Sequence, residues 1–271
     1  MNKVEEAKEA EVVEKKPALE KGMFSSKAGV AVLLVGWAYV SWTIGQYVVV
    51  WSLKLAKWMG ADVGWVNSPL GTMIITILMY AISLTLIIVV PWRLNKKFKS
   101  SREELGLSGL PTWTDVGLAP AGFVAYLVLA NIFVGLMSMF AWFDATQKQE
   151  VGYDTYLTGP DRIFAFVSLV VVAPIAEELI FRGWLYGKMR ARLNVWVSVL
   201  IVSVFFGLMH MGMDADGGIV GLNVAVNVFG MSIVMCAIRE ITGTIWSGIF
   251  LHMIKNAIAF YFLFINPIML Q

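Results

Sequence analysis

The chain has 271 residues, of which 58% are hydrophobic and 15% are charged, and its mean hydropathy is +0.72. This composition excludes an ordinary soluble domain and predicts an integral membrane protein. A formal net charge of +2 gives no sign of a nucleic-acid surface, and a single cysteine excludes an internal disulfide and a cysteine-rich metal site. Cys236 lies in an apolar segment, where we expect it to act as a small hydrophobic residue.

The chain begins with a polar segment, which we expect to be a solvated tail over residues 1–28. Lys and Glu are mixed in MNKVEEAKEAEVVEKKPALEKG, and large apolar residues are few. These apolar residues never form the continuous central run of a signal peptide. The rest of the chain, residues 29–271, is expected to be one helical membrane domain.

Seven apolar segments follow, and most are long enough to cross a bilayer as a helix, which takes about 20 residues. Runs of this length indicate helices rather than the short alternating strands of an outer-membrane barrel. We therefore predict an all-α, polytopic, integral membrane bundle of about seven to eight transmembrane helices. The segments are 29–56, 69–91, 116–143, 162–191, 195–211, 218–238 and 242–266.

Basic residues gather at alternate ends of the predicted helices. Cytoplasmic loops of membrane proteins are rich in Lys and Arg, so the loop at 92–103 and the end of the fourth segment are predicted to be cytoplasmic. The N-terminus is then cytoplasmic as well. Lys54 and Lys57 fall on the outer side and fit this orientation less well. The supporting residues are Arg93, Lys96, Lys97, Lys99, Arg102, Lys188, Arg190 and Arg192.

Polar and ionisable residues interrupt three of the later apolar segments. Because an ionisable group near the bilayer centre costs a few kcal/mol or more, such residues are functional candidates. At a rise of 1.5 Å per residue, four of them lie roughly 15–22 Å from the predicted cytoplasmic ends of their helices. We therefore expect Glu177, His210, His252 and Asn256 to meet in one cavity near the middle of the membrane.

Helical spacing separates the roles of the two adjacent glutamates. Glu178 and Arg182 stand four residues apart on one helical face, so an ion pair between them is expected. Glu177 is rotated about 100° from Glu178 on an ideal helix, which leaves it as the candidate general base. His252 and Asn256 also stand four residues apart and can point two polar groups at one atom.

Three further residues could border the same cavity. Phe206 precedes His210 by one helical turn and could form a wall. Asn223 and Asn227 lie one turn apart in the sixth segment, where they could line the cavity or form hydrogen bonds to neighbouring helices.

Three motifs occur in order on the later apolar segments, and they are Glu177-Glu178-x-x-x-Arg182, Phe206-x-x-x-His210 and His252-x-x-x-Asn256. Together they resemble the CAAX prenyl protease and bacteriocin-processing family, a group of intramembrane endopeptidases. The similarity covers about residues 160–260, which would be the catalytic core. The stretch ITGTIWSGIFLH before His252 fits the same pattern, and EELGLSGLPTWTDVGLA at 103–119 is similar to the family's lead into its helical domain.

The resemblance implies a conical cavity and a glutamate-dependent, metal-independent protease without a cofactor. Glu177 and His210 would position and activate a water, while His252 and Asn256 would form the oxyanion hole. Peptide hydrolysis needs a base for the water and donors for the developing negative charge, and a neutral histidine and an asparagine can both donate. The substrate would be a peptide or protein, and membrane-associated and prenylated substrates both remain open.

Two other functions fit the same residues. Two glutamates and two histidines could bind zinc in a membrane protease, although His-Glu-x-x-His is missing and the histidines lie on separate helices. Intramembrane carboxylates and histidines also serve proton pathways, so a non-enzymatic transporter or membrane scaffold is the other alternative. Loss of function in stably inserted variants of Glu177 and His210 would favour the enzyme.

Overall fold

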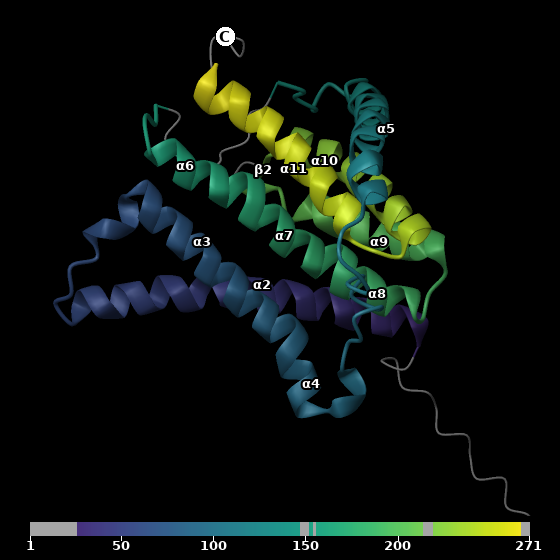
Figure 1. Cartoon of the computed structure of the whole chain (residues 1–271), viewed down its shortest axis with the longest axis horizontal. Coiled ribbons are helices and arrows are strands. Elements are labelled where there is room, and N and C mark those ends of the chain that lie inside the picture. The colour runs from purple at the N-terminus through teal and green to yellow at the C-terminus, as the bar shows by residue number, and fades with distance from the viewer. Residues whose placement is uncertain (1–25, 147–151, 154–155, 214–218, 267–271) are drawn as a thin grey trace, which may run out of the picture.

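The computed structural model describes residues 26–146, 152, 153, 156–213 and 219–266, and Figure 1 shows how their helices are arranged. Within these ranges six helical spans are long and apolar enough to cross a membrane, and a shorter apolar helix accompanies them. The protein is therefore an all-helical, multi-pass integral membrane bundle, as the sequence predicts. The predicted polar tail lies outside the described residues except at its end, where the first described helix begins.

The first part of the bundle is built from three long apolar spans. The second span consists of two α-helices, α3 (Pro69–Leu84) and α4 (Val90–Leu94), joined into one continuous rod by a π-helical segment at Thr85–Val89. Short 3₁₀ turns precede and follow this rod, at Gly64–Asn67 and Lys96–Phe98. The helices are α2 (Lys27–Trp58), α3 (Pro69–Leu84), α4 (Val90–Leu94) and α5 (Trp113–Met137).

The second part of the bundle carries the predicted motifs. Its first span runs from Asp161 to Arg190 and contains two π-helical segments, Val167–Val172 and Leu179–Leu185. Its last helix ends in another, Tyr261–Ile265. The elements are α6 (Asp161–Phe166), α7 (Ala173–Glu178), α8 (Tyr186–Arg190), α9 (Val195–Leu208), β1 (Gly212–Met213), β2 (Ile219–Val220), α10 (Leu222–Thr242) and α11 (Trp246–Phe260).

Two prolines account for two of the π-helical segments within these spans. Pro91 follows the π-helical segment at Thr85–Val89, and Pro174 follows the one at Val167–Val172. Proline has no N–H to donate and its ring clashes with the preceding turn, so the helix ahead of it is distorted. Such π-helical turns often occur at functional sites.

The predicted start of the sixth span is wrong in its structural type. The prediction began at residue 218, which lies outside the described residues, but Ile219 and Val220 form the strand β2. β2 pairs antiparallel with β1, and α10 begins only at Leu222. Gly221 separates strand from helix with a φ of 81°, a left-handed conformation that glycine adopts readily. Apolar character alone did not distinguish this short hairpin from the helix that follows.

The span α6–α8 lies between two groups of helices (Figure 1). α2 and α3 pack on one side, α10 and α11 pack on the other, and α5 and α9 pack against α10. Glycines allow close approach at two of these contacts. A Cβ added to Gly45 would lie 2.9 Å from the Met79 carbonyl oxygen, and one added to Gly207 would lie 2.9 Å from that of Ala225. α3 from one group and α11 from the other both contact α7, so side chains from both groups reach it.

The segment before α5 holds the ends of the later helices together. The Arg239 guanidinium donates to the Glu103 carbonyl oxygen at 2.9 Å, and the Ile245 N–H donates to that of Gly106 at 3.1 Å. At the start of α5, Asp115 forms a capping box with Thr112 and accepts hydrogen bonds from Thr244 and Ser247. This explains how the 103–119 stretch, distant in sequence from the motifs, supports their helices.

Candidate active site

The predicted ion pair between Glu178 and Arg182 is present and buried. Arg182 Nη1 lies 2.7 Å from Glu178 Oε1, and the two side chains are 1% and 0% exposed. The Arg182 guanidinium also lies 4.3 Å from the centre of the Phe206 ring, a cation–π contact. Because each charge has its counterion, the pair can remain in the apolar interior.

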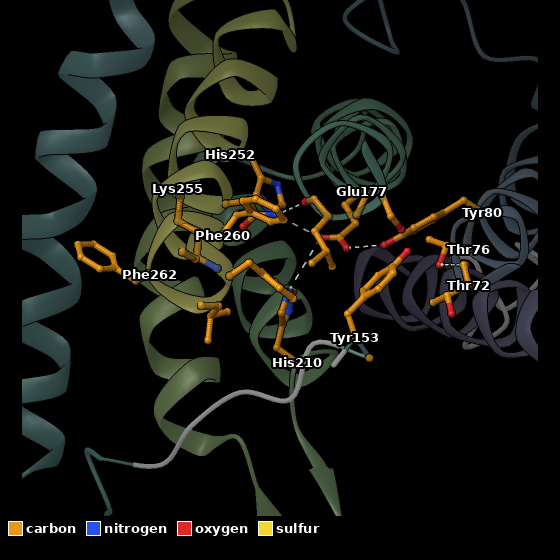
Figure 2. A pocket seen from close by; sticks show the side chains of 18 residues that line it. Thr72, Thr76, Tyr80, Tyr153, Glu177, His210, His252, Lys255, Phe260 and Phe262 are labelled. Atoms are coloured by element: carbon orange, nitrogen blue, oxygen red, sulfur yellow. Dashed lines mark hydrogen bonds and ion pairs between the residues drawn. The ribbon is translucent and has the colours of Figure 1, made fainter. Parts of the chain in front are cut away.

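Glu177 points toward the two histidines (Figure 2), whereas the ion-pair partner of Arg182 is Glu178. Its Oε1 accepts a 2.7 Å hydrogen bond from the Tyr80 hydroxyl of α3. Its Oε2 lies 4.0 Å from His210 Nε2 and 3.9 Å from His252 Nε2. Among the described residues Glu177 Oε2 is buried and accepts no hydrogen bond. One carboxylate oxygen is thus fixed, and the other faces two imidazoles across a short gap.

The hydrogen bonds at Nδ1 determine which atoms the histidines present to Glu177. His210 Nδ1 lies 2.8 Å from the Phe206 carbonyl oxygen, and His252 Nδ1 lies 3.3 Å from Glu178 Oε1. Both partners act as acceptors, so Nδ1 carries the proton in each ring. A neutral form of either histidine therefore presents an unprotonated Nε2 to the cavity.

Asn256 has a backbone partner that results from Pro174. Asn256 Nδ2 donates to the Leu169 carbonyl oxygen at 2.8 Å. In the π-helical segment the Ala173 N–H bonds to Ser168, and Pro174 has no N–H with which to continue that pattern to Leu169. The asparagine side chain therefore satisfies a carbonyl that the helix leaves without its usual donor. One N–H and the oxygen of the Asn256 amide remain for other partners.

A cavity of about 550 Å³ joins these groups. Glu177, His210, His252 and Asn256 all line it, so the structure brings the four predicted residues to one space. Side chains from α3, from the π-helical segment Val167–Val172, from α11 and from the π-helical segment after it complete the wall. They include Thr72, Thr76, Tyr80, Ser168, Leu169, Lys255, Phe260, Leu263 and Phe264.

The two asparagines of α10 lie elsewhere. Asn227 Oδ1 accepts a 2.6 Å hydrogen bond from the Tyr126 hydroxyl of α5, and Asn223 Nδ2 donates to the Ala145 carbonyl oxygen at 2.7 Å. Neither residue lines the cavity that contains Glu177 and the two histidines. Of the two roles considered from the sequence, these contacts agree with hydrogen bonding to neighbouring segments.

The geometry gives the zinc alternative little support. Within the described ranges there is no group of three or more His, Cys, Asp or Glu side chains placed to hold a metal. Ligands about 2.0–2.1 Å from a tetrahedral zinc ion lie roughly 3.4 Å from one another. The separations of 3.9 and 4.0 Å between Glu177 and the histidines are wider. Closing them on an ion would require the side chains to move.

Tyr80 and Lys255 are among the cavity residues that were not anticipated from the sequence. Tyr80 lies within an apolar helix, where its hydroxyl requires a hydrogen-bond partner, and that requirement was the available signal. Lys255 was hidden because it falls between His252 and Asn256, two residues of a recognised motif. Its charge inside an apolar segment was itself a reason to expect a function.

Fold and site together define a multi-pass membrane protein with a carboxylate–histidine centre enclosed among its helices. Residues 159–258 match the family model described as type II CAAX prenyl endopeptidase Rce1-like. The chain therefore contains an Rce1-like type II CAAX prenyl endopeptidase domain over these residues, which confirms the resemblance. A domain of this type implies an intramembrane protease with peptide or protein substrates. Comparisons with curated proteins and with solved structures found no match.

Proposed function

We propose that the protein is a glutamate-dependent intramembrane endopeptidase in which Glu177 and His210 activate a water molecule. The observation that carries this proposal is the separation of 4.0 Å between Glu177 Oε2 and His210 Nε2. Two acceptors at this distance are too far apart for a direct hydrogen bond, but both can bind one water. That water would have its two protons directed at basic atoms and a lone pair free to attack a carbonyl carbon.

Each group then has a defined part in hydrolysis. Glu177 takes a proton as the water oxygen bonds to the peptide carbon, and later gives that proton to the leaving amine nitrogen as the C–N bond breaks. Tyr80 is a positioning residue, since its hydroxyl holds Glu177 Oε1 and so directs Oε2 toward the water. The products are a carboxylate and a free amine.

The negative charge on the carbonyl oxygen needs hydrogen-bond donors. Asn256 retains one amide N–H after bonding to Leu169. His252 can donate from Nε2 only as an imidazolium, because its Nδ1 proton already points to Glu178. We propose that His252 is protonated when the oxyanion forms, with Glu178 as its counterion and Arg182 holding Glu178 in place. This proposal differs from the neutral donor expected from the sequence.

Substrates of this centre are proposed to be membrane-associated peptides or proteins, including prenylated ones, as the family description suggests. The apolar side chains of Phe260, Leu263 and Phe264 in the wall would favour such molecules over soluble ones. The basic loops described above support an orientation with the N-terminus in the cytoplasm.

The proposal is tested with purified protein and two probes, a farnesylated CAAX peptide and a mixture of unprenylated apolar peptides, with products identified by mass spectrometry. Glu177→Gln and His210→Ala should each lower cleavage by a factor of about 10²–10⁴, the usual contribution of acid–base catalysis. Glu103→Gln, an exposed glutamate outside the cavity, is the matched control and should cleave normally. Full activity in folded Glu177→Gln would refute the role of Glu177, whereas absence of cleavage in the folded wild-type protein with both probes would favour a non-enzymatic protein.

A further inference from the structure

Lys255 places a cation in the cavity where the proposed reaction occurs. The residue lines the cavity together with Glu177, both histidines and Asn256. His252, Lys255 and Asn256 stand at helical spacings of three and four residues, so they share one face of α11. Figure 2 shows the Lys255 side chain extending toward the space that Glu177, His210 and His252 face.

The described surroundings of Lys255 do not provide it with an ion-pair partner. In the described parts of the chain Glu178 contacts Arg182 and His252, while Glu177 lies nearest the two histidines and acts on Lys255 electrostatically across the cavity. A lysine inside a membrane domain costs several kcal/mol unless it meets an opposite charge or water. Its retention on the cavity wall indicates a role toward a molecule that enters the cavity.

We propose that Lys255 binds a carboxylate of the peptide substrate close to the scissile bond, an inference that rests on the proposed protease function. A carboxylate that entered this space without a cation would be repelled by Glu177 in surroundings of low polarity. The ammonium group of Lys255 offsets that repulsion and donates hydrogen bonds to the anion. Lys255 thereby selects peptides that carry a carboxylate at this position.

The geometry also limits where the carboxylate can be. Lys255 lies three residues beyond His252 on α11. The rise over these residues and the length of the lysine side chain together place the ammonium group within about 10 Å of His252. An extended peptide covers that distance in about three residues. The anion is therefore either the C-terminal carboxylate of a substrate cut near its end, or an acidic side chain within about three residues of the cut.

Binding to the inactive Glu177→Gln variant tests this without requiring turnover. The probe is a farnesylated peptide with cysteine four residues from its end, made with a free C-terminal carboxylate, with a C-terminal amide, and as the amide with glutamate as the last residue. The carboxylate form should bind about tenfold to a hundredfold more tightly than the amide, the usual worth of a charged hydrogen bond. Adding Lys255→Met should bring this ratio close to one, whereas Lys255→Arg should retain it.

Controls separate this inference from the proposed function. Lys57→Met removes an exposed lysine at the end of α2 and should leave the binding ratio unchanged. If the amide that ends in glutamate binds as tightly as the free acid, Lys255 binds an acidic side chain. If it binds as weakly as the plain amide, Lys255 binds the C-terminal carboxylate. Equal binding of all three forms, or a preference that survives Lys255→Met, would overturn the inference. Cleavage of the peptide by Glu177→Gln would instead overturn the proposed function.

Discussion

Asn256 donates a 2.8 Å hydrogen bond from its side-chain amide to the backbone carbonyl of Leu169, which lies on a different span. This bond fixes the direction of the amide that is proposed to stabilise the oxyanion. It exists because Pro174 cannot donate to the preceding turn. The position of a side chain with a proposed catalytic role therefore depends on a proline that does not line the cavity.

The first prediction concerns Pro174. Pro174→Ala supplies an N–H that can compete with Asn256 for the carbonyls of the preceding turn, so the amide loses its fixed orientation. We expect kcat to fall about tenfold or more, in proportion to the value of an oxyanion donor, while KM changes little. Pro91→Ala is the matched control, since Pro91 follows a similar π-helical segment in the α3–α4 rod. Equal kcat values for the two variants would contradict this explanation.

The second prediction couples Asn256 to the same proline. Asn256→Ala leaves the Leu169 carbonyl without its donor, and we expect it to cost about 1–3 kcal/mol of the free energy of unfolding. In a Pro174→Ala background the added backbone N–H can take over the carbonyl, so the cost should be smaller. Thermal unfolding in detergent of both single variants and the double variant measures the coupling. Strictly additive losses would mean that the two residues do not share this carbonyl.

The third prediction concerns Tyr80. Tyr80→Phe removes the hydroxyl that holds Glu177 Oε1 but retains the ring and its edge contact with Trp42. We expect kcat to fall by about tenfold, with KM nearly unchanged, because a 1 Å displacement of the proposed base is costly. Tyr39→Phe, which alters an exposed tyrosine on α2, should behave as the wild type. An unaltered kcat in Tyr80→Phe would show that Glu177 is oriented without this bond.

The fourth prediction concerns the buried ion pair. Arg182→Met leaves the Glu178 carboxylate buried beside His252 without its arginine, and should cost about 3–5 kcal/mol of the free energy of unfolding. The double variant Glu178→Gln/Arg182→Met removes both charges and should be more stable than Arg182→Met alone. Unfolding in detergent is the measurement. If the double variant is the less stable of the two, the pair is not the dominant electrostatic contact of either residue.

The fifth prediction addresses metal dependence. Because the gaps between Glu177 and the two histidines suit a water better than a tetrahedral zinc ion, chelators should leave peptide cleavage unchanged. The assay compares purified protein before and after prolonged dialysis against a strong chelator, with added zinc as a further arm. Activity that disappears on chelation and returns with zinc alone would establish the metalloprotease.

The sequence predicted the parts of this site that follow from helical periodicity. Apolar length located the spans, and depths estimated from a constant rise predicted the cavity that Glu177, His210, His252 and Asn256 share. The Asn256–Leu169 bond could not be anticipated, since it depends on a π-helical turn that regular α-helical spacing does not include. The contribution of Tyr80 could not be predicted either, because the sequence around Tyr80 does not indicate which distant residue accepts its hydroxyl hydrogen bond.

The Tyr80 contact also changes what counts as the functional unit. The family match covers residues 159–258, yet Thr72, Thr76 and Tyr80 of α3 line the cavity, and the Tyr80 hydroxyl holds the carboxylate of Glu177. A fragment limited to residues 159–258 would lack the wall of the cavity that α3 forms. A displacement of α3 therefore alters the cavity and the position of Glu177 without touching a motif residue.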